Sequence, residues 1–451
     1  MPKGRKWLLM VKIKINIVFK KIVRNKYPLL FLLLTFISVN PWSKIPIGNT
    51  FTGYLICYGI IACIIYDLKK QKINIFKGRY FLVGIFIIWA CIGIFRGFFE
   101  IGNYWDGKNL ASNSLHVLFP LVVYILASPE TLRSILKTWY TWAIFAFILF
   151  FYWVSNFSQF YLGPVYFAVC FLPLLTFQRR PWLISILFVL GVILATYNIE
   201  DARSQFIKAV VAFAIFFACI FKKFISNNVL RGASFLLLTA TFVLLFLGLT
   251  GRFNIFSDTS DKYSGQYTSS SVRDGENVTA DMSSDTRTFL YVEVFQSAIK
   301  NHYVLLGRSL ARGHDTSFFA NDVEDLQYVR YASNIRIERQ SDEMCFTNIF
   351  TWLGLVGMLL YIGIYLYSMW LGLYRSQSYY VKLCACVVAF NFSYGWVENA
   401  TRFDILNFTY WIFIAICLSP EFRRMTDADF KTWFRSIFYK PRKRITFPYN
   451  I

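Results

Sequence analysis

Apolar stretches of about twenty residues recur along the whole chain, separated mostly by short polar connections. A helix needs roughly 17 to 25 mostly apolar residues to cross the hydrocarbon core of a bilayer. Only helices and closed barrels satisfy every backbone polar group there. We therefore expect an all-α, polytopic integral membrane protein with about 12 transmembrane helices. The expected spans lie near residues 27–42, 50–66, 80–99, 111–128, 138–155, 162–178, 181–198, 205–221, 232–250, 345–370, 381–396 and 404–419.

The composition supports this fold class. The 451 residues are 56% hydrophobic and only 16% charged, which is more apolar than a typical soluble domain. The formal net charge of +22 comes from Lys and Arg that lie mainly in the termini and in short connections between spans. That distribution is typical of positive-inside topology and argues against a nucleic-acid partner.

The same distribution predicts the orientation and the organisation of the chain. Both termini are expected in the cytoplasm, and one large loop, in which acidic residues outnumber basic ones, is expected outside. The predicted parts are a basic cytoplasmic segment (1–26), transmembrane helices 1–9 (27–250), the large periplasmic loop (251–343), transmembrane helices 10–12 (344–419) and a basic cytoplasmic tail (420–451).

The large loop changes character near Asp285. Residues 257–284 are rich in Ser, Thr, Asp and Gly and are expected to be irregular. From Asp285 onward, apolar residues recur at helical spacing, which predicts an amphipathic helix lying on the membrane surface. The residues of that stripe are Phe289, Val292, Phe295, Gln296 and Ile299.

Metal and cofactor chemistry have no sequence signature here. The nine cysteines form no CxxC pair and there are only three histidines, so neither a metal nor a cofactor is expected. P-loop, GxGxxG, HExxH and GxSxG motifs are also missing from the sequence. Any chemistry therefore has to come from charged side chains at the membrane boundary.

Arginines recur on the side of the membrane where positive-inside bias should deplete them. Arg203, Arg287 and Arg402 each stand near the start of a predicted helix. Guanidinium groups bind phosphate oxygens bidentately, and helix N-termini add free N–H groups, so these three residues are candidates for binding a diphosphate. Three further loop arginines are candidate substrate-binding residues: Arg308, Arg312 and Arg339. The alternative for each is pairing with a nearby acid or with lipid headgroups.

Asp342 and Glu343 occupy the last polar positions before the span that begins near Cys345. Desolvation at such a boundary raises the pKa of a carboxyl group and a neighbouring Arg lowers it, so either residue could act as a general base toward a sugar hydroxyl. The alternative is a solvated carboxylate at a helix N-terminus, where acids are favoured in any case.

Three segments resemble the O-antigen polymerase/ligase superfamily. In "DTRTFLYVEVFQSAIKNHYVLLGRSLARG" an Arg opens a helix and a Gly closes a turn about twenty residues later, here Arg287 and Gly307. "SDEMCFTNIFTWLGLVG" is similar to the segment that leads into the next span and ends in Gly-x-x-Gly, here Gly354 and Gly357. "DARSQFIKAVVAF" is similar to the family's other arginine site and matches at Arg203.

The chain departs from this family at one place. Many members carry a His-Asn pair about eleven residues before the first Gly of the ending, whereas this chain has Glu343 and Met344 there. The departure weakens assignment to the ligase branch. His302 and His314 lie elsewhere in the loop.

The resemblance implies metal-independent glycosyl transfer at the periplasmic face of a bacterial inner membrane. The substrate would be an oligosaccharide on undecaprenyl diphosphate, Arg203 and Arg287 would stabilise the leaving diphosphate, and Asp342 or Glu343 would serve the acceptor hydroxyl. Repeat-unit polymerisation in O-antigen or lipopolysaccharide biosynthesis is the first expectation, and chain-length regulator and flippase proteins are the expected partners besides membrane lipids. The alternatives are an O-antigen ligase, a lipid-linked oligosaccharide flippase and a non-enzymatic scaffold.

Overall fold

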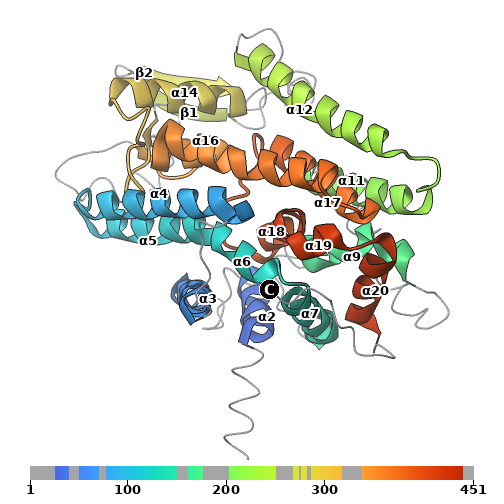
Figure 1. Ribbon diagram of the computed structural model, residues 1–451. Helices are drawn as coiled ribbons and strands as arrows, with labels where there is room; N and C mark the ends of the chain where they lie inside the picture. The colour runs from blue at the N-terminus through green and yellow to red at the C-terminus, as the bar shows by residue number, and fades with distance from the viewer. Residues whose placement is uncertain are drawn as a thin grey trace, which may run out of the picture. The chain divides into compact units, whose positions relative to one another are not determined.

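The computed structural model describes residues 26–39, 50–70, 78–149, 161–175, 203–249, 268–273, 276–281, 286–316 and 338–439. Within these ranges nearly all regular structure is helical, and the strands form only two short antiparallel pairs (Figure 1). The all-α class is therefore confirmed. The chain divides into two compact units, one of residues 1–67, 122–224 and 404–451, and the other of residues 68–121 and 225–403.

The first unit is built of helices from three separate stretches of the chain. Its helices pack through buried aromatic side chains, with rings of α9, α18 and α20 in mutual contact. Two buried indole N–H groups bridge its elements: Trp139 donates to Thr35 Oγ1 and Trp433 donates to Pro129 O. The elements are α2 (Lys26–Val39), α3 (Thr50–Lys70), α6 (Val123–Leu126), α7 (Pro129–Leu149), η5 (Tyr161–Val165), α9 (Tyr166–Cys170), η6 (Leu172–Leu174), α11 (Arg203–Ile220), α18 (Ile405–Leu418), α19 (Pro420–Arg424) and α20 (Asp427–Phe438).

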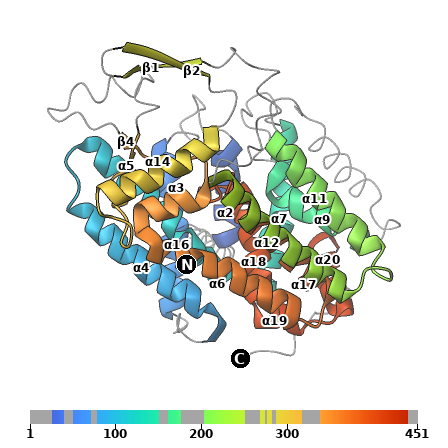
Figure 2. The same cartoon turned by 90° about the horizontal axis from the view of Figure 1, so that it is seen from above.

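The second unit surrounds one long helix, α16 (Cys345–Tyr374), which contacts α4, α12, α14 and α17 (Figure 2). Its other elements are η2 (Gly78–Tyr80), α4 (Phe81–Phe98), α5 (Tyr104–Leu118), α12 (Asn227–Leu249), β1 (Thr268–Arg273), β2 (Glu276–Asp281), α14 (Thr286–Lys300), β3 (His314–Asp315), β4 (Glu338–Arg339) and α17 (Tyr379–Tyr394); η3 (Phe119–Val122) stands at the boundary of the two units.

Five helical stretches among the described residues are long and apolar enough to cross a membrane by length and composition. They are Phe51–Lys70, Gly78–Phe98, Tyr104–Leu126, Asn227–Leu247 and Cys345–Tyr374. Shorter apolar helices occupy Lys26–Ser38, Phe206–Ile220 and Ile405–Leu418. This set indicates an α-helical membrane protein. The expected number of twelve spans stays a prediction, and the span expected at 181–198 lies outside the described residues.

Two expectations differ from the structure. The apolar stretch expected to span near 162–178 is broken into η5, α9 and η6, because the backbone at Gly163 is non-helical and Pro164 and Pro173 cannot continue a helix. Within the stretch expected to be irregular, β1 pairs with β2 in an antiparallel hairpin. The sequence between these strands is Asp274–Gly275, a pair typical of hairpins.

The helix expected after Asp285 is confirmed as α14. Its inner face packs on α16, where Val294, Ala298 and Tyr303 form a buried cluster with Phe350. A second cluster joins Leu290 and Tyr291 to Met344. These contacts place α14 against the first turns of α16.

Candidate functional site

Helix α16 is interrupted at Gly354, where φ is +70° and ψ is −172°. The turn that follows α14 supplies hydrogen bonds at the interruption. The Leu355 N–H donates to Val304 O at 2.8 Å, and the Arg308 N–H donates to Thr351 O at 2.8 Å. Gly307, also at positive φ, lies against the backbone of Gly354. The broken helix therefore keeps its backbone groups bonded inside the protein, as a membrane environment requires.

Three side chains from α4 and α5 hold the same region. Arg96 donates from Nη1 to Leu306 O at 2.6 Å and from Nη2 to Gly307 O at 3.1 Å. Trp89 Nε1 donates to Leu353 O at 2.9 Å, and buried Asn113 donates to Leu310 O at 2.8 Å. Because these donors bond carbonyls of the turn and of the break, which have no regular helical partner, the turn is fixed relative to α16.

The chain entering α16 is organised by Asn348. Its Oδ1 accepts from the Asp342 N–H at 2.6 Å, and its Nδ2 donates to the carbonyls of Asp342 and Met344. Asn399 Nδ2 also donates to Asp342 O at 3.2 Å. These bonds use the backbone of Asp342 and leave its carboxylate for other contacts.

The Asp342 carboxylate is buried beside two basic side chains. Its Oδ1 lies 3.7 Å from His314 Nε2 and 3.6 Å from Arg339 Nε, and the side chains of Asp342 and His314 are each only 1% exposed. Among the residues that the structure describes, neither carboxylate oxygen has a hydrogen-bond partner, and neither has His314 Nε2. The hydroxyl of nearby Thr347 donates to Met344 O instead.

Burial shifts the pKa values of Asp342 and His314 in opposite directions. It raises the pKa of Asp342 to about 7, against the lowering effect of Arg339 and with a smaller contribution from Glu293. Burial and the positive charge of Arg339 lower the pKa of His314 to about 4. At neutral pH the imidazole is therefore uncharged, and the carboxyl group exchanges a proton near physiological pH, as a general base requires.

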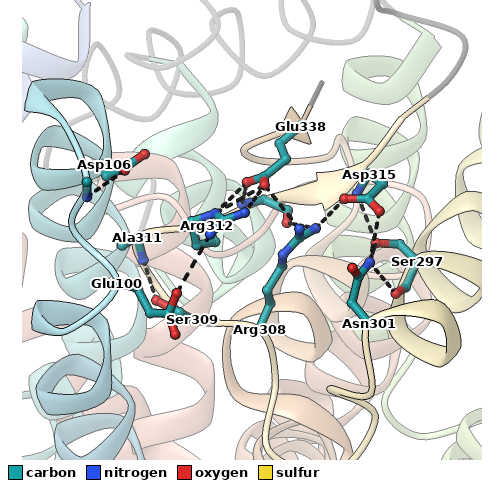
Figure 3. A network of polar contacts seen from close by, with 12 residues as sticks. Glu100, Asp106, Ser297, Asn301, Arg308, Ser309, Ala311, Arg312, Asp315 and Glu338 are labelled. Atoms are coloured by element: carbon teal, nitrogen blue, oxygen red, sulfur yellow. Dashed lines mark hydrogen bonds and ion pairs between the residues drawn. The ribbon is translucent and has the colours of Figure 1, made fainter. Parts of the chain in front are cut away.

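A network of ion pairs adjoins this site (Figure 3). Arg308 Nη1 lies 2.5 Å from Asp315 Oδ1 and its Nη2 lies 3.1 Å from Glu338 Oε1. Arg312 Nε donates to both oxygens of Glu338, at 3.1 and 2.9 Å, and this pairing raises the pKa of the Arg312 guanidinium. The network ties the β3 region to β4, which ends at Arg339.

The expected substrate-binding residues Arg308 and Arg312 therefore have carboxylate partners within the protein. Of the two expected bases, Asp342 is buried and Glu343 is exposed. The solvated helix cap proposed as the alternative does not describe Asp342, because the cap of α16 makes no side-chain hydrogen bond and the carboxylate is buried. Arg339 lies beside Asp342, and its substrate-binding role stays a prediction.

The remaining expected arginines are placed by their backbones. Arg287 is the second residue of α14, and its side chain lies outside the described part. Arg203 begins α11 in the first unit, and its side chain is likewise not among the described ones. Arg402 is exposed near the end of the second unit. Their convergence on one diphosphate stays a prediction.

Sequence reasoning missed the partner of Asp342. The position at which the resemblance predicts a histidine holds Glu343, yet His314 reaches the site from β3. Its only signal in the sequence was its membership of the same loop, because the β3–β4 pairing that places His314 opposite Arg339 has no local motif. Asn348 was missed too, since an Asn inside an apolar span is also common as a simple core residue.

Metal chemistry gains no support from the described residues, which contain no group of three or more His, Cys, Asp or Glu able to hold a metal ion. The fold and the site together define an α-helical membrane protein with a buried carboxylate–imidazole pair just before the N-terminus of a broken helix. No family model, curated protein or solved structure matches the chain.

Proposed function

We propose that this protein is a membrane glycosyltransferase that polymerises undecaprenyl-diphosphate-linked oligosaccharide repeat units into O-antigen or a related surface polysaccharide. The observation that carries the proposal is the buried Asp342 carboxylate, with His314 3.7 Å away, directly before a helix long enough to span the membrane. A base at the N-terminal end of such a helix is suited to a substrate whose lipid lies in the bilayer and whose sugar lies in water.

The chemistry follows from the positions of the charged groups. Asp342 accepts the proton of an acceptor sugar hydroxyl, and that oxygen attacks the anomeric carbon of the donor. The bond from the anomeric carbon to the diphosphate oxygen breaks, and the lipid diphosphate leaves with the electron pair. The proton held by Asp342 then passes to solvent.

We assign stabilisation of the leaving diphosphate to arginine side chains. Arg287 stands in the first turn of α14, where free backbone N–H groups add to its attraction for phosphate. Arg339 borders Asp342 and opposes the rise in its pKa. Arg203 and Arg402 are further candidates, carried over from the sequence. This set lets the reaction proceed without a metal ion.

His314 is assigned a positioning role. A neutral imidazole beside the carboxyl group donates or accepts one hydrogen bond, which orients the acceptor hydroxyl or the carboxyl proton. In the proposed site, His314 takes the role of the histidine that the resemblance predicts at the position of Glu343.

The proposal places the active site at the periplasmic face of a bacterial inner membrane, with both termini in the cytoplasm. Twelve spans and a periplasmic loop of about residues 251–343 belong to the proposal. The surplus of Lys and Arg in the short connections supports this orientation.

The test is incubation of the purified protein, in lipid nanodiscs, with lipid-linked repeat units. Growth of lipid-linked chains without any other acceptor supports the polymerase. Transfer only after addition of a lipid A core acceptor means the ligase, and movement of the lipid-linked unit across vesicles without new glycosidic bonds means a flippase. Either of the last two results contradicts the proposal.

A further inference from the structure

Helix α14 carries its polar and apolar residues in an unusual arrangement. Glu293 and Ser297 point inward and are buried, and Glu293 accepts a hydrogen bond from Thr316 Oγ1 at 2.9 Å. Its outer face exposes Val292, Phe295 and Ile299, at 39%, 36% and 68% of their surface, with one polar residue, Gln296, among them. A helix that faces water places its charged residues outward and its apolar residues inward.

Helix α20 in the first unit shows the ordinary arrangement. It buries Phe430, Trp433 and Phe434 and exposes Asp429 and Thr432. The exposed apolar residues of α14 lie opposite its buried apolar residues Val294 and Ala298, and α20 has no such second apolar face.

Exposed apolar side chains also lie on elements next to α14 in the same unit. The turn that follows α14 exposes Leu305 and Leu306. Helices α12 and α16, both in contact with α14, expose Phe246 and Leu359 along stretches apolar enough to span a membrane. Two helices in contact with α14 thus expose apolar side chains on stretches that hydrocarbon could cover.

The length of α14 limits how it can meet the bilayer. Its 15 residues make a rod of about 22 Å, shorter than the ~30 Å hydrocarbon core. Exposed Lys300, Asn301 and His302 close its C-terminal end with polar side chains. Such a helix lies at the boundary, with its apolar face in lipid and its polar end in the headgroup region.

We propose that the outer face of α14, formed by Val292, Phe295 and Ile299, is embedded in the hydrocarbon of the bilayer. Membrane lipid is its occupant, and the helix serves as an anchor that sets the depth of the site on its inner side. Glu293 on that inner side is near enough to Asp342 for its charge to act on it. The inference concerns membrane contact alone and does not depend on the glycosyltransferase assignment.

The experiment uses the full-length protein in nanodiscs with one nitroxide introduced through a non-natural amino acid, which leaves the nine native cysteines in place. Labels at Ile299 and, separately, at Val292 are compared with a label at Phe246, on the exposed side of α12, and at Ala428, an exposed residue of α20. Collision with oxygen, which concentrates in hydrocarbon, is measured against collision with a water-soluble nickel complex.

The expected result is that Ile299 and Val292 favour oxygen over nickel, as Phe246 does, whereas Ala428 favours nickel. Preference for nickel at both α14 positions would place the face in water. Protection from both reagents would mean that another protein or a second copy covers it. Either outcome overturns lipid as the occupant. Use of two labelled positions guards against one label that disturbs folding.

Discussion

The backbone of Gly307 lies directly against the backbone of Gly354, although the two residues belong to segments far apart in the sequence. A Cβ atom on Gly307 would stand 2.5 Å from the Gly354 nitrogen, and a Cβ atom on Gly354 would overlap the carbonyl group of Leu305. Both residues also have φ near +70°, where a side chain is strained. The junction holds the turn after α14 inside the break of α16.

Substitution of Gly354 by Ala tests this junction. We expect the variant to lose about 3 kcal/mol or more of stability, from the positive φ and from displacement of the Leu305 carbonyl. The measurement is thermal unfolding in nanodiscs. The matched control is Gly363→Ala in the same helix, where an added Cβ meets only Leu82 Cδ1 at 3.7 Å. Equal stability of the two variants would show that the junction is not tightly packed.

Glu338 is the carboxylate that both arginines of the ion-pair network share. Its side chain is only 6% exposed and it pairs with both Arg308 and Arg312. Glu338→Gln leaves two largely buried guanidinium groups without a full counter-charge, so we expect a loss of about 3 kcal/mol in stability. Glu100→Gln, at a carboxylate that is 48% exposed and 3.7 Å from Arg312, should cost less than about 1 kcal/mol. Chemical denaturation of both variants checks the difference, and a neutral Glu338→Gln would contradict it.

The opposite pKa shifts of Asp342 and His314 predict a pH effect on stability. Asp342 binds its proton more tightly in the folded state, so its contribution to stability falls as the pH rises from about 4 to about 7. His314 binds its proton less tightly in the folded state, so its contribution rises between about pH 4 and pH 6.5. The two contributions oppose one another over this shared range.

Substitution of either residue should therefore reveal the pH dependence of stability that the other residue contributes. Relative to the native protein, Asp342→Asn is expected to gain stability as the pH rises from 4 to 6.5. His314→Gln is expected to lose stability over the same range. Melting temperatures at several pH values provide the measurement. Parallel pH profiles for all three proteins would mean that the pair is not buried as described.

Local patterns in the sequence were enough to predict the helices. Hydrophobic length gave α4 and α16 nearly at their observed bounds, and helical spacing gave α14. The break at Gly354 was not predicted, since its position inside an apolar run is also compatible with a straight helix. The hydrogen bonds that the Leu355 N–H donates to Val304 O and the Arg308 N–H donates to Thr351 O accompany the break, and they depend on long-range packing.

The candidate site was predictable in its carboxylates but not in their environment. Their position before a span made Asp342 and Glu343 equal candidates for the base. In the structure only Asp342 is buried, and Asn348 bonds its backbone so that its side chain faces inward. The contact with His314 needed the β3–β4 pairing. The arginine pairs were foreseen only in general terms, as an alternative to phosphate binding.

Chain growth from lipid-linked repeat units, measured as a function of pH, tests most directly whether Asp342 is the base of a glycosyl transfer. For the native protein the rate should rise as the pH increases through about 7, because the carboxyl group has to lose its proton. Asp342→Asn should lose activity by at least about a hundredfold at every pH while remaining folded. Glu343→Gln should keep the rate and move the profile only slightly toward lower pH, because the charge of Glu343 makes a small contribution to the raised pKa of Asp342. Full activity in folded Asp342→Asn, or a native rate that does not change with pH around 7, would show that Asp342 is not the base.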